Sequence, residues 1–401
     1  MPQPLSTAAT MPRVLVALFA CASGLCVANV YYAQPLLDAL AADFGIRPAA
    51  IGAVVAATQA GCALALVLLV SLGDRMDRRR LMLWQCAALV AALFGTAAAT
   101  SAAALLAGML CLGLLGTAMT QGLIAFAATA AAPQERGHVV GAAQGGVVIG
   151  LLLARVASGL LADLVGWRGV YTAAALAMLA LMALLWRALP PAPSSAGGLA
   201  YPALVGSMLT LLRTDRVLQI RGTLALLMFA AFSIFWSAMV LPLRGAPHAL
   251  SHTAIGAFGL VGALGALAAT RAGRWADRGL AQRATAGALA LLLAAWLPLW
   301  LMPHSLGWLV LGVVALDLGG QAIHVTNQAL VLRGDAGLHG RLVGCYMLFY
   351  VAGSGLGAAA SPAVFAAWGW SGVCALGAAV SASAGVFWAA SLPYMPHENG
   401  A

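Results

Sequence analysis

The 401-residue chain contains no lysine, and only 8% of its residues are charged. Soluble domains carry about 25% charged residues, so this chain lacks the polar groups needed to cover a surface in water. Hydrophobic residues instead make up 63% of the sequence. This composition excludes an ordinary soluble protein and predicts an all-α polytopic membrane protein.

Motifs typical of several enzyme classes are absent as well. The sequence has no phosphate-binding P-loop, which argues against a pump driven by ATP hydrolysis. It also has no HExxH zinc motif, GxSxG elbow or paired-aspartate motif. These absences argue against an intramembrane enzyme that uses Asp317 and His324. We therefore expect a protein that is not an enzyme and needs no cofactor.

Neither the cysteines nor the arginines indicate a metal or nucleic-acid site. The seven cysteines fall inside apolar runs without metal-ligand spacing, so we expect buried, small hydrophobic side chains. The 20 basic residues are all arginines and lie mostly between apolar runs, so the net charge of +9 does not indicate nucleic-acid binding. We expect a monomer whose partners are a lipid bilayer and a small-molecule substrate.

The sequence does contain a series of long apolar runs. A helix needs about 20 residues to cross the hydrocarbon core of a bilayer. Runs of about that length are separated by charges, prolines and glycines. The predicted helices span residues 14–36, 49–72, 81–100, 102–127, 139–163, 168–188, 219–243, 253–271, 284–302, 305–332, 340–366 and 370–392. The pattern predicts twelve transmembrane helices in two pseudo-symmetric six-helix bundles.

A proline-rich break separates the two groups of helices. Residues 190–195 read Pro-Pro-Ala-Pro-Ser-Ser, and charged residues follow. This composition is typical of a connection between domains. We predict an N-terminal half at residues 1–189, a cytoplasmic linker at residues 190–218 and a C-terminal half at residues 219–401.

The arginines predict the orientation of the chain in the membrane. With the N-terminus in the cytoplasm, sixteen arginines, Arg221 among them, fall on the cytoplasmic side, and only Arg47, Arg168 and Arg244 fall outside. Cytoplasmic loops carry an excess of basic residues, so this bias predicts that both termini are cytoplasmic.

Two short Asp-Arg loops recur about half a chain apart. The first contains Asp74, Arg75, Arg79 and Arg80 after Leu72. Both loops fall on the predicted cytoplasmic side. A carboxylate at a helix end beside guanidinium groups can form a switchable ion pair, so we predict a cytoplasmic gate. The alternative is a pair of solvated turns.

The second loop contains Gly273, Asp277 and Arg278. Both loops resemble the signature cytoplasmic loop of the major facilitator superfamily, although Val70 replaces the leading glycine of the first copy and Trp275 occupies the leucine position of the second. Half-chain repetition is typical of transporters built from internal repeats. The resemblance implies two six-helix halves that rock around a central site.

The predicted helix 139–163 resembles the glycine-rich helix of drug–proton antiporters in this superfamily. Gly141, Gly150, Ser158 and Gly159 fall at the spacing of that pattern, and Arg155 stands where proline is expected. The end of the first predicted helix and residues 316–328 further resemble a bacterial drug-efflux subgroup. The resemblance implies proton-coupled efflux across the bacterial cytoplasmic membrane, with the proton gradient as the energy source.

A polar stripe follows one face of the predicted helix 305–332. Asp317, Gln321, His324 and Gln328 are spaced at i, i+4, i+7 and i+11, which places them on one face, with Asn327 beside them. Polar groups facing lipid would be unsatisfied, so we predict that this stripe lines a cavity. The alternative is a hydrogen-bonded packing seam.

Three ionisable residues inside predicted helices are candidates for proton coupling, because such residues are costly in a membrane. Burial favours a protonated carboxyl, so Asp317 is the predicted proton carrier, and His324 shares its face. Arg155 lies about 12 Å from the outer end of its helix. We hypothesise that Arg155 neutralises Asp317 when the outer side is closed; alternatively, Arg155 extends toward the outer surface.

The resemblance also implies that four helices line a central cavity. It nominates Asn29, Tyr32 and Gln34, then Thr117, Thr120 and Gln121, then Ser233, Trp236 and Ser237. Tyr346 and Tyr350 lie one turn apart and can close the wall. Aromatic walls favour apolar or cationic compounds. Alternatively, the aromatic residues serve helix packing or the membrane interface.

These observations predict a secondary active transporter that exports small hydrophobic or cationic compounds in exchange for protons. Two alternatives stay open. One is a proton-coupled transporter of a specific metabolite, such as a sugar or an amino acid. The other is a membrane receptor that no longer transports.

Overall fold

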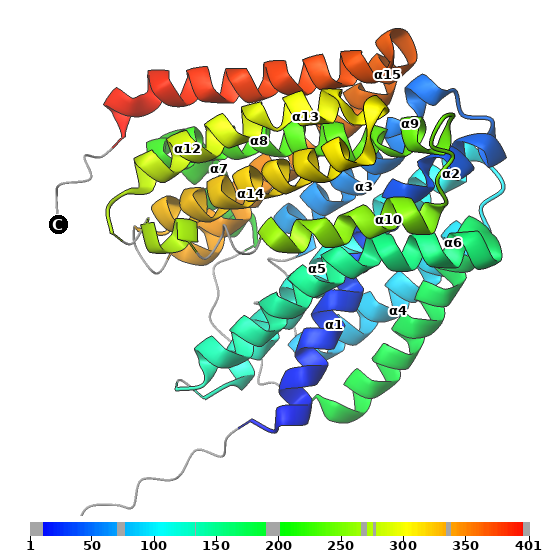
Figure 1. Ribbon diagram of the computed structural model, residues 1–401. Helices are drawn as coiled ribbons and strands as arrows, with labels where there is room; N and C mark the ends of the chain where they lie inside the picture. Colours follow the sequence, from blue (N-terminus) through cyan, green and yellow to red (C-terminus); the bar gives the residue numbers. More distant parts are fainter. Residues whose placement is uncertain are drawn as a thin grey trace, which may run out of the picture.

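The computed structural model describes residues 11–69, 77–132, 134–189, 201–265, 271–275, 278–333 and 338–395. Within these ranges the chain forms helices and no strand, which confirms the predicted all-α class (Figure 1). Several helices start at a side chain that accepts a hydrogen bond from the first turn, as Ser101, Asp215 and Ser305 do. Such caps satisfy backbone N–H groups that otherwise lack a partner.

The N-terminal half consists of six long segments, some of them built from two shorter helices. Its elements are α1 (Arg13–Tyr31), η1 (Gln34–Leu36), α2 (Leu37–Phe44), η2 (Pro48–Ala50), α3 (Gly52–Leu64), η3 (Ala65–Leu69), α4 (Arg78–Ala97), α5 (Ala102–Ala130) and α6 (Arg136–Ala188). The first predicted helix, residues 14–36, corresponds to α1 and the turn η1, which contains Pro35, and the same crossing continues through α2.

The C-terminal half follows the same plan. Its elements are α8 (Arg216–Ala238), α9 (Val240–Arg244), α10 (His252–Val261), η5 (Gly262–Leu264), α12 (Ala281–Ala294), α13 (Trp296–Trp300), η6 (Met302–His304), α14 (Leu306–Val331), α15 (His339–Ser391) and η8 (Leu392–Tyr394). Between the halves, α7 (Tyr201–Thr214) lies within the predicted linker, and Met208 packs in one cluster with Leu218 and Cys345.

Helices α6 and α15 each contain two membrane crossings. Each has 53 residues, which at 1.5 Å per residue is more than twice the thickness of a bilayer core. Gly166 (φ 73°) and Gly369 (φ 62°) interrupt them in backbone conformations that favour glycine. Each helix therefore turns back at its glycine.

Nine helices among the described residues are long and apolar enough to cross a membrane, and α10 with η5 adds a shorter apolar segment. The predicted twelve was therefore not exact as a count of separate helices. The difference arises because two crossings are merged at Gly166, two more are merged at Gly369, and the segment that starts at His252 is described only in part.

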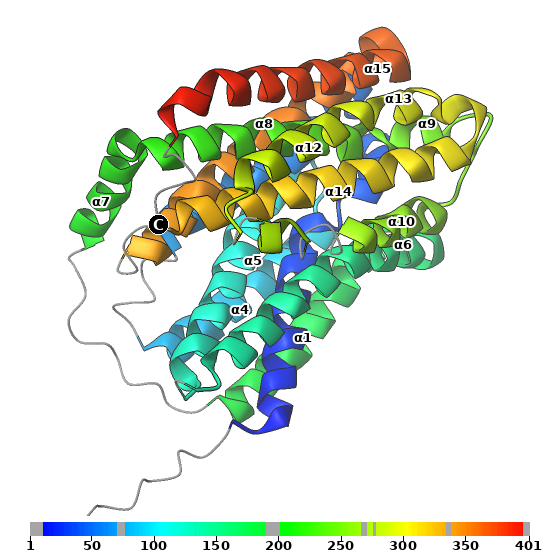
Figure 2. The same ribbon diagram turned by 60° about the vertical axis from the view of Figure 1, so that its left-hand side comes forward.

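The two halves approach each other closely at one end. Figures 1 and 2 show α2, α9 and the start of α10 gathered beside the bend of α6, whereas the opposite ends of α5 and α14 diverge. A Cβ on Gly52 of α3 would lie 2.1 Å from the backbone oxygen of Ala358 on α15. By the predicted orientation, this closed end faces outward.

Candidate functional site

Arg155 lies buried between the two halves, with 3% of its surface exposed. Its Nε donates a hydrogen bond of 2.8 Å to Oε1 of Gln34 in the N-terminal half. Its Cζ lies 4.0 Å from the centre of the Trp236 ring on α8 and 5.5 Å from that of Tyr31. Its Nη2 has no hydrogen-bond partner. Arg155 thus points inward, joins the halves and keeps one donor group unused.

Asp317 on α14 is a second buried ionisable residue, with 3% of its surface exposed. Its Oδ2 makes no hydrogen bond. Gly262 and Gly265 lie directly against it: a Cβ on Gly262 would be 2.8 Å from Oδ2, and one on Gly265 would be 3.3 Å from Cβ of Asp317. The side chain therefore occupies a space that only glycines leave open.

Arg155 and Asp317 share a wall but do not form an ion pair. No nitrogen of Arg155 lies within 4.0 Å of an Asp317 oxygen among the described residues. Both side chains face the segment from α10 to η5, where Gly259 meets Cδ of Arg155 and Gly262 meets the Asp317 carboxylate. These glycines are about 4.5 Å apart along the helix. The predicted coupling between the two residues stays a hypothesis.

The rest of the predicted polar stripe divides into two environments. His324, Gln321 and Gln328 are partly exposed, and Nδ1 of His324 lies 3.0 Å from the hydroxyl of Tyr346. Asn327, in contrast, is fully buried inside the C-terminal half. His324 also packs edge-on against Phe229, with ring centres 5.2 Å apart.

Arg221, which the arginine count placed on the cytoplasmic side, lies near the start of α8 and points into the C-terminal half. It is fully buried, and Nη1 donates to Oγ1 of Thr285 at 3.1 Å and to Oδ1 of Asn327 at 3.4 Å. Its position inside the predicted helix 219–243 was the sequence signal for burial. A buried guanidinium inside one bundle is a structural element that sequence reasoning missed.

Two aromatic residues of the predicted cavity wall, Tyr350 and Trp236, contact residues of the opposite half. The hydroxyls of Tyr31 and Tyr350 hydrogen-bond to each other across the halves, so Tyr31 was missed by the sequence reasoning. Tyr350 meets the Phe229 ring edge-on. Tyr32 is buried, and the Asn29 amide donates to its own helix at Leu25.

The other nominated cavity residues take more ordinary positions. Thr120 donates to its own helix, Ser233 bonds Ser354 within the C-terminal half, and Ser237 is fully buried. Thr117 and Gln121 are both partly exposed on α5.

Part of the predicted cytoplasmic gate lies outside the described residues, namely Asp74, Arg75 and Asp277. Within the described part, Asp77 caps α4 by accepting from the backbone N–H groups of Arg79 and Arg80. Arg79 Nη2 donates to the backbone oxygen of Trp186. Arg278 is exposed in the turn before α12. The described gate residues thus connect the start of α4 to the end of α6, and no ion pair between the two loops is present among the described residues.

Two of the predicted glycines on α6 lie directly against the backbone of another helix. A Cβ on Gly150 would lie 2.2 Å from the oxygen of Gly24 on α1, and one on Gly159 would lie 2.3 Å from the oxygen of His252 on α10. A Cβ on Gly141 would meet nothing within 4 Å. Ser158 is buried and donates to the backbone oxygen of Arg155.

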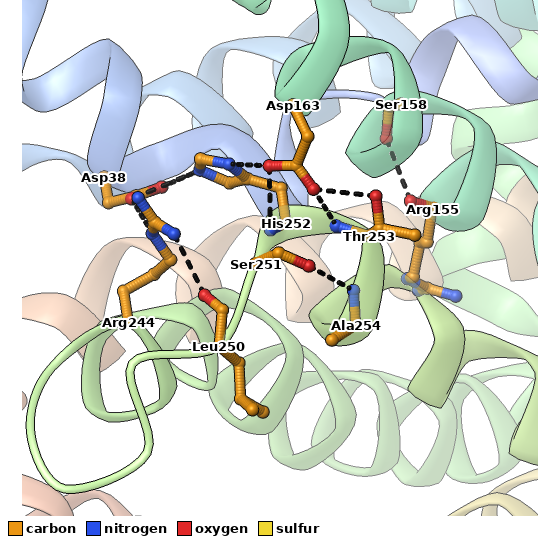
Figure 3. Close-up of polar contacts among 10 residues, drawn as sticks. All are labelled: Asp38, Arg155, Ser158, Asp163, Arg244, Leu250, Ser251, His252, Thr253 and Ala254. Carbon is orange, nitrogen blue, oxygen red and sulfur yellow. Dashed lines mark hydrogen bonds and ion pairs between the residues drawn. The ribbon is translucent and has the colours of Figure 1, made fainter.

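A cluster of charged residues lies at the closed end and was not predicted from the sequence. Its members stand at the ends of apolar runs, where charged residues are ordinary and do not indicate a site. We call Asp38, Asp163, Arg244 and His252 the bridging cluster. Figure 3 shows His252 between the two carboxylates, with Nε2 3.0 Å from Asp38 and Nδ1 3.0 Å from Asp163. Nε of Arg244 donates to Asp38 at 2.9 Å. Two residues of each half therefore meet in one ionic network.

Asp163 also caps α10 from the other half of the molecule. Its Oδ1 accepts from the backbone N–H of His252 at 3.1 Å, and its Oδ2 accepts from the N–H and hydroxyl of Thr253 at 2.8 Å and 2.7 Å. A carboxylate is favourable at a helix N-terminus, where N–H groups are otherwise unpaired (Figure 3). The approach is possible because Gly159 lies one turn before Asp163.

Two apolar helical halves, closed at one end around buried Arg155 and Asp317, define a membrane transporter. The sequence pattern of the Major Facilitator Superfamily matches residues 19–339. The chain belongs to that superfamily, and its members are not enzymes.

Similar proteins agree with this assignment. The chain is 41% identical over 368 residues to the putative uncharacterized transporter YgaY of Escherichia coli K12, covering 92% of this chain and 93% of that one. It is 31% identical over 376 residues to a probable transporter of Streptomyces coelicolor, covering 92% and 85%. The fold matches a bacterial homologue of the lysosomal transporter Spinster with a TM-score of 0.76 at 13% identity, over 97% and 98% of the chains.

Proposed function

We propose that the protein exports small hydrophobic compounds in exchange for protons, with Asp317 as the proton-binding group. The observation that carries this proposal is the buried carboxylate of Asp317 beside the interface between the halves, whose Oδ2 has no hydrogen-bond partner in the part of the chain that the structure describes. A carboxylate in that setting is costly, and binding a proton removes the charge. The proton gradient is the proposed energy source, without a further cofactor.

Alternating access gives the proton and the substrate a common pathway. The bridging cluster and the Gly159–His252 approach hold one end closed, and the opposite ends of the halves diverge (Figure 2). In the proposed orientation, both termini are cytoplasmic, the chain is a monomer in the bacterial cytoplasmic membrane, and this conformation is open inward. Separation of the bridging cluster then opens the outer side.

The aromatic residues support a hydrophobic substrate more than a cationic one. Tyr350 and Phe229 offer ring surfaces along the interface, with ring centres 3.9 Å apart. The face of Trp236 is already covered by the Arg155 guanidinium. A cationic compound would have to displace that guanidinium from the ring, whereas a neutral aromatic compound would not.

One observation favours a second candidate, a metabolite that carries a carboxylate. Nη2 of Arg155 has no hydrogen-bond partner although the residue is buried. Guanidinium groups bind carboxylates through paired N–H donors. Export of such an anion would use the same path and the same proton carrier.

A flux assay in proteoliposomes tests these proposals. It compares neutral aromatic drugs, lipophilic cations, aromatic carboxylates and sugars at two transmembrane pH gradients. We expect gradient-driven movement of the neutral drugs in the wild type and none in Asp317→Asn, with Asp43→Asn as the control on the exposed Asp43–Arg168 pair. Drug flux that keeps its pH dependence in Asp317→Asn would contradict the proton role. No flux of any compound would favour a receptor.

A further inference from the structure

The bridging cluster fits together only when His252 carries two ring protons. Both ring nitrogens lie 3.0 Å from carboxylate oxygens, Nε2 from Asp38 and Nδ1 from Asp163. Neutral histidine has one N–H donor and one acceptor nitrogen, so one carboxylate would then face a lone pair. The imidazolium form donates to both.

The charge balance of the cluster leads to the same conclusion. Asp38 and Asp163 supply two negative charges, and Arg244 supplies one positive charge. A protonated His252 makes the cluster neutral, and a neutral His252 leaves one uncompensated negative charge. Among the described residues, the charged groups in the hydrogen-bond network of His252 are these three, from α2, α6 and α9, and Ser251 and Thr253 on its own segment are neutral.

All contacts of the His252 ring with carboxylates cross the interface between the halves. Asp38 is on α2 and Asp163 is on α6, whereas His252 begins α10 and Arg244 ends α9. When the halves separate at this end, the ring loses both acceptors together. Only 8% of His252 is exposed in the closed arrangement, so separation also returns it to water.

We propose that His252, held between Asp38 and Asp163, is a second proton-binding site that is occupied when this end of the transporter closes. On closure, one proton from the adjacent solution binds the imidazole and forms an N–H group to a carboxylate. On opening, the same proton returns to the same solution. The site therefore makes closure depend on pH without adding to the number of protons carried across the membrane.

The sign of the pH dependence follows from the ordinary acidities of the two residue types. A histidine released to water has a pKa of about 6.5 and an aspartate one of about 3.9. The contribution of the cluster to closure is fully present between about pH 3.9 and about pH 6.5. It is lost as the pH rises above about 6.5, because the imidazole then loses its second proton. It is lost again in stronger acid, where the carboxylates become neutral.

This role is separable from the proposed function of Asp317. The test measures the distance between spin labels on Ala49→Cys and His304→Cys, exposed positions near the closed end of each half, in a chain whose native cysteines are replaced by alanine. The protein also carries Asp317→Asn, which removes the other proposed proton carrier. Samples in lipid nanodiscs are compared between pH 5.5 and pH 8.5.

We expect the ratio of short to long distances to fall by up to about tenfold per pH unit above neutrality, the limit for one proton. His252→Gln should remove this dependence, and His252→Lys should keep the short distance up to pH 8.5. Asp43→Asn is the matched control, because the Asp43–Arg168 pair lies within the N-terminal half, and it should leave the profile unchanged.

Three results would overturn the proposal: a wild-type profile without pH dependence, an unchanged profile in His252→Gln, or a changed one in Asp43→Asn. If His252→Gln does not fold, Asp38→Asn replaces it. That variant keeps the Asp163 cap on α10 and loses one acceptor, so its transition should move to lower pH. Failure of drug transport in the protein with native Asp317, together with a normal distance profile, would contradict the proposed function and leave this site intact.

Discussion

The Arg155 guanidinium lies 4.0 Å from the centre of the Trp236 ring, so a cation and an aromatic face from opposite halves meet inside the molecule. The contact lies beside the Gln34 hydrogen bond, which orients the guanidinium. Closure of this end therefore depends on two layers of contact between the halves, the inner one at Arg155 and the bridging cluster beyond it.

Replacement of Trp236 by leucine should weaken closure. Cation–π contacts contribute about 0.5–2 kcal/mol, so the closed-to-open ratio should fall by about twofold to thirtyfold. The label distances described above measure this ratio. Trp300→Leu is the control, because Trp300 is half exposed on the outside of the C-terminal half. An equal effect of both variants would mean that only general packing was lost.

Arg155 and Asp317 should behave as coupled residues although they form no ion pair. Both face the glycines of the α10–η5 segment, so a change of charge at one alters the electrostatic environment of the other. In a double-mutant cycle with Arg155→Ala and Asp317→Asn, we expect a coupling of about 0.5–3 kcal/mol in the rate of substrate counterflow, which is transport measured without a proton gradient. Fully additive losses of transport would disprove the coupling.

Gly159→Ala should prevent close approach of α6 and α10. The added Cβ would lie 2.3 Å from the oxygen of His252, which is backbone and cannot rotate away. Overpacking of this kind costs about 1–3 kcal/mol, so thermal stability and the closed population should both decrease.

Gly141→Ala is the matched control for that variant, because its Cβ would meet nothing within 4 Å on the same helix. Alanine is the better helix former by about 1 kcal/mol, so Gly141→Ala should leave stability unchanged or raise it slightly. A loss of stability in Gly141→Ala equal to that of Gly159→Ala would show that the contact with α10 is not the cause.

Arg221→Ala should destabilise the C-terminal half. It removes the donor to Thr285 and Asn327, two fully buried residues, and a buried acceptor left without its donor costs about 1–3 kcal/mol. Thermal unfolding followed by tryptophan fluorescence measures the loss, with the exposed Arg213→Ala as the control. Equal melting temperatures in the two variants would contradict this role.

Periodicity and composition predicted the helices well, because each crossing needs a long apolar run whatever surrounds it. Gly166 and Gly369 lie between predicted runs, and both are turning points in the structure. The composition of the predicted linker did not predict α7, which forms there and packs Met208 against the C-terminal half. That packing depends on partners far along the chain.

The sequence predicted which residues of the candidate site are buried better than it predicted which residues they contact. Burial of Arg155 and Asp317 followed from their positions inside apolar runs. The stripe on α14 was less uniform than its spacing suggests, because Asn327 turns into the core toward Arg221. Helical spacing places residues on a face, but it does not say which neighbouring helix that face meets.

The sequence by itself determined the class of protein, since a chain with 8% charged residues and long apolar runs satisfies its backbone in lipid only as helices. It also predicted that Arg155 and Asp317 lie buried, because both stand inside apolar runs. Only the tertiary structure decided which charges meet. The bridging cluster joins residues that lie up to 214 positions apart in the sequence, each at or near the end of a helix. They meet because the two halves close at this end. Ionic contacts depend on distance in space, which the order of residues does not contain.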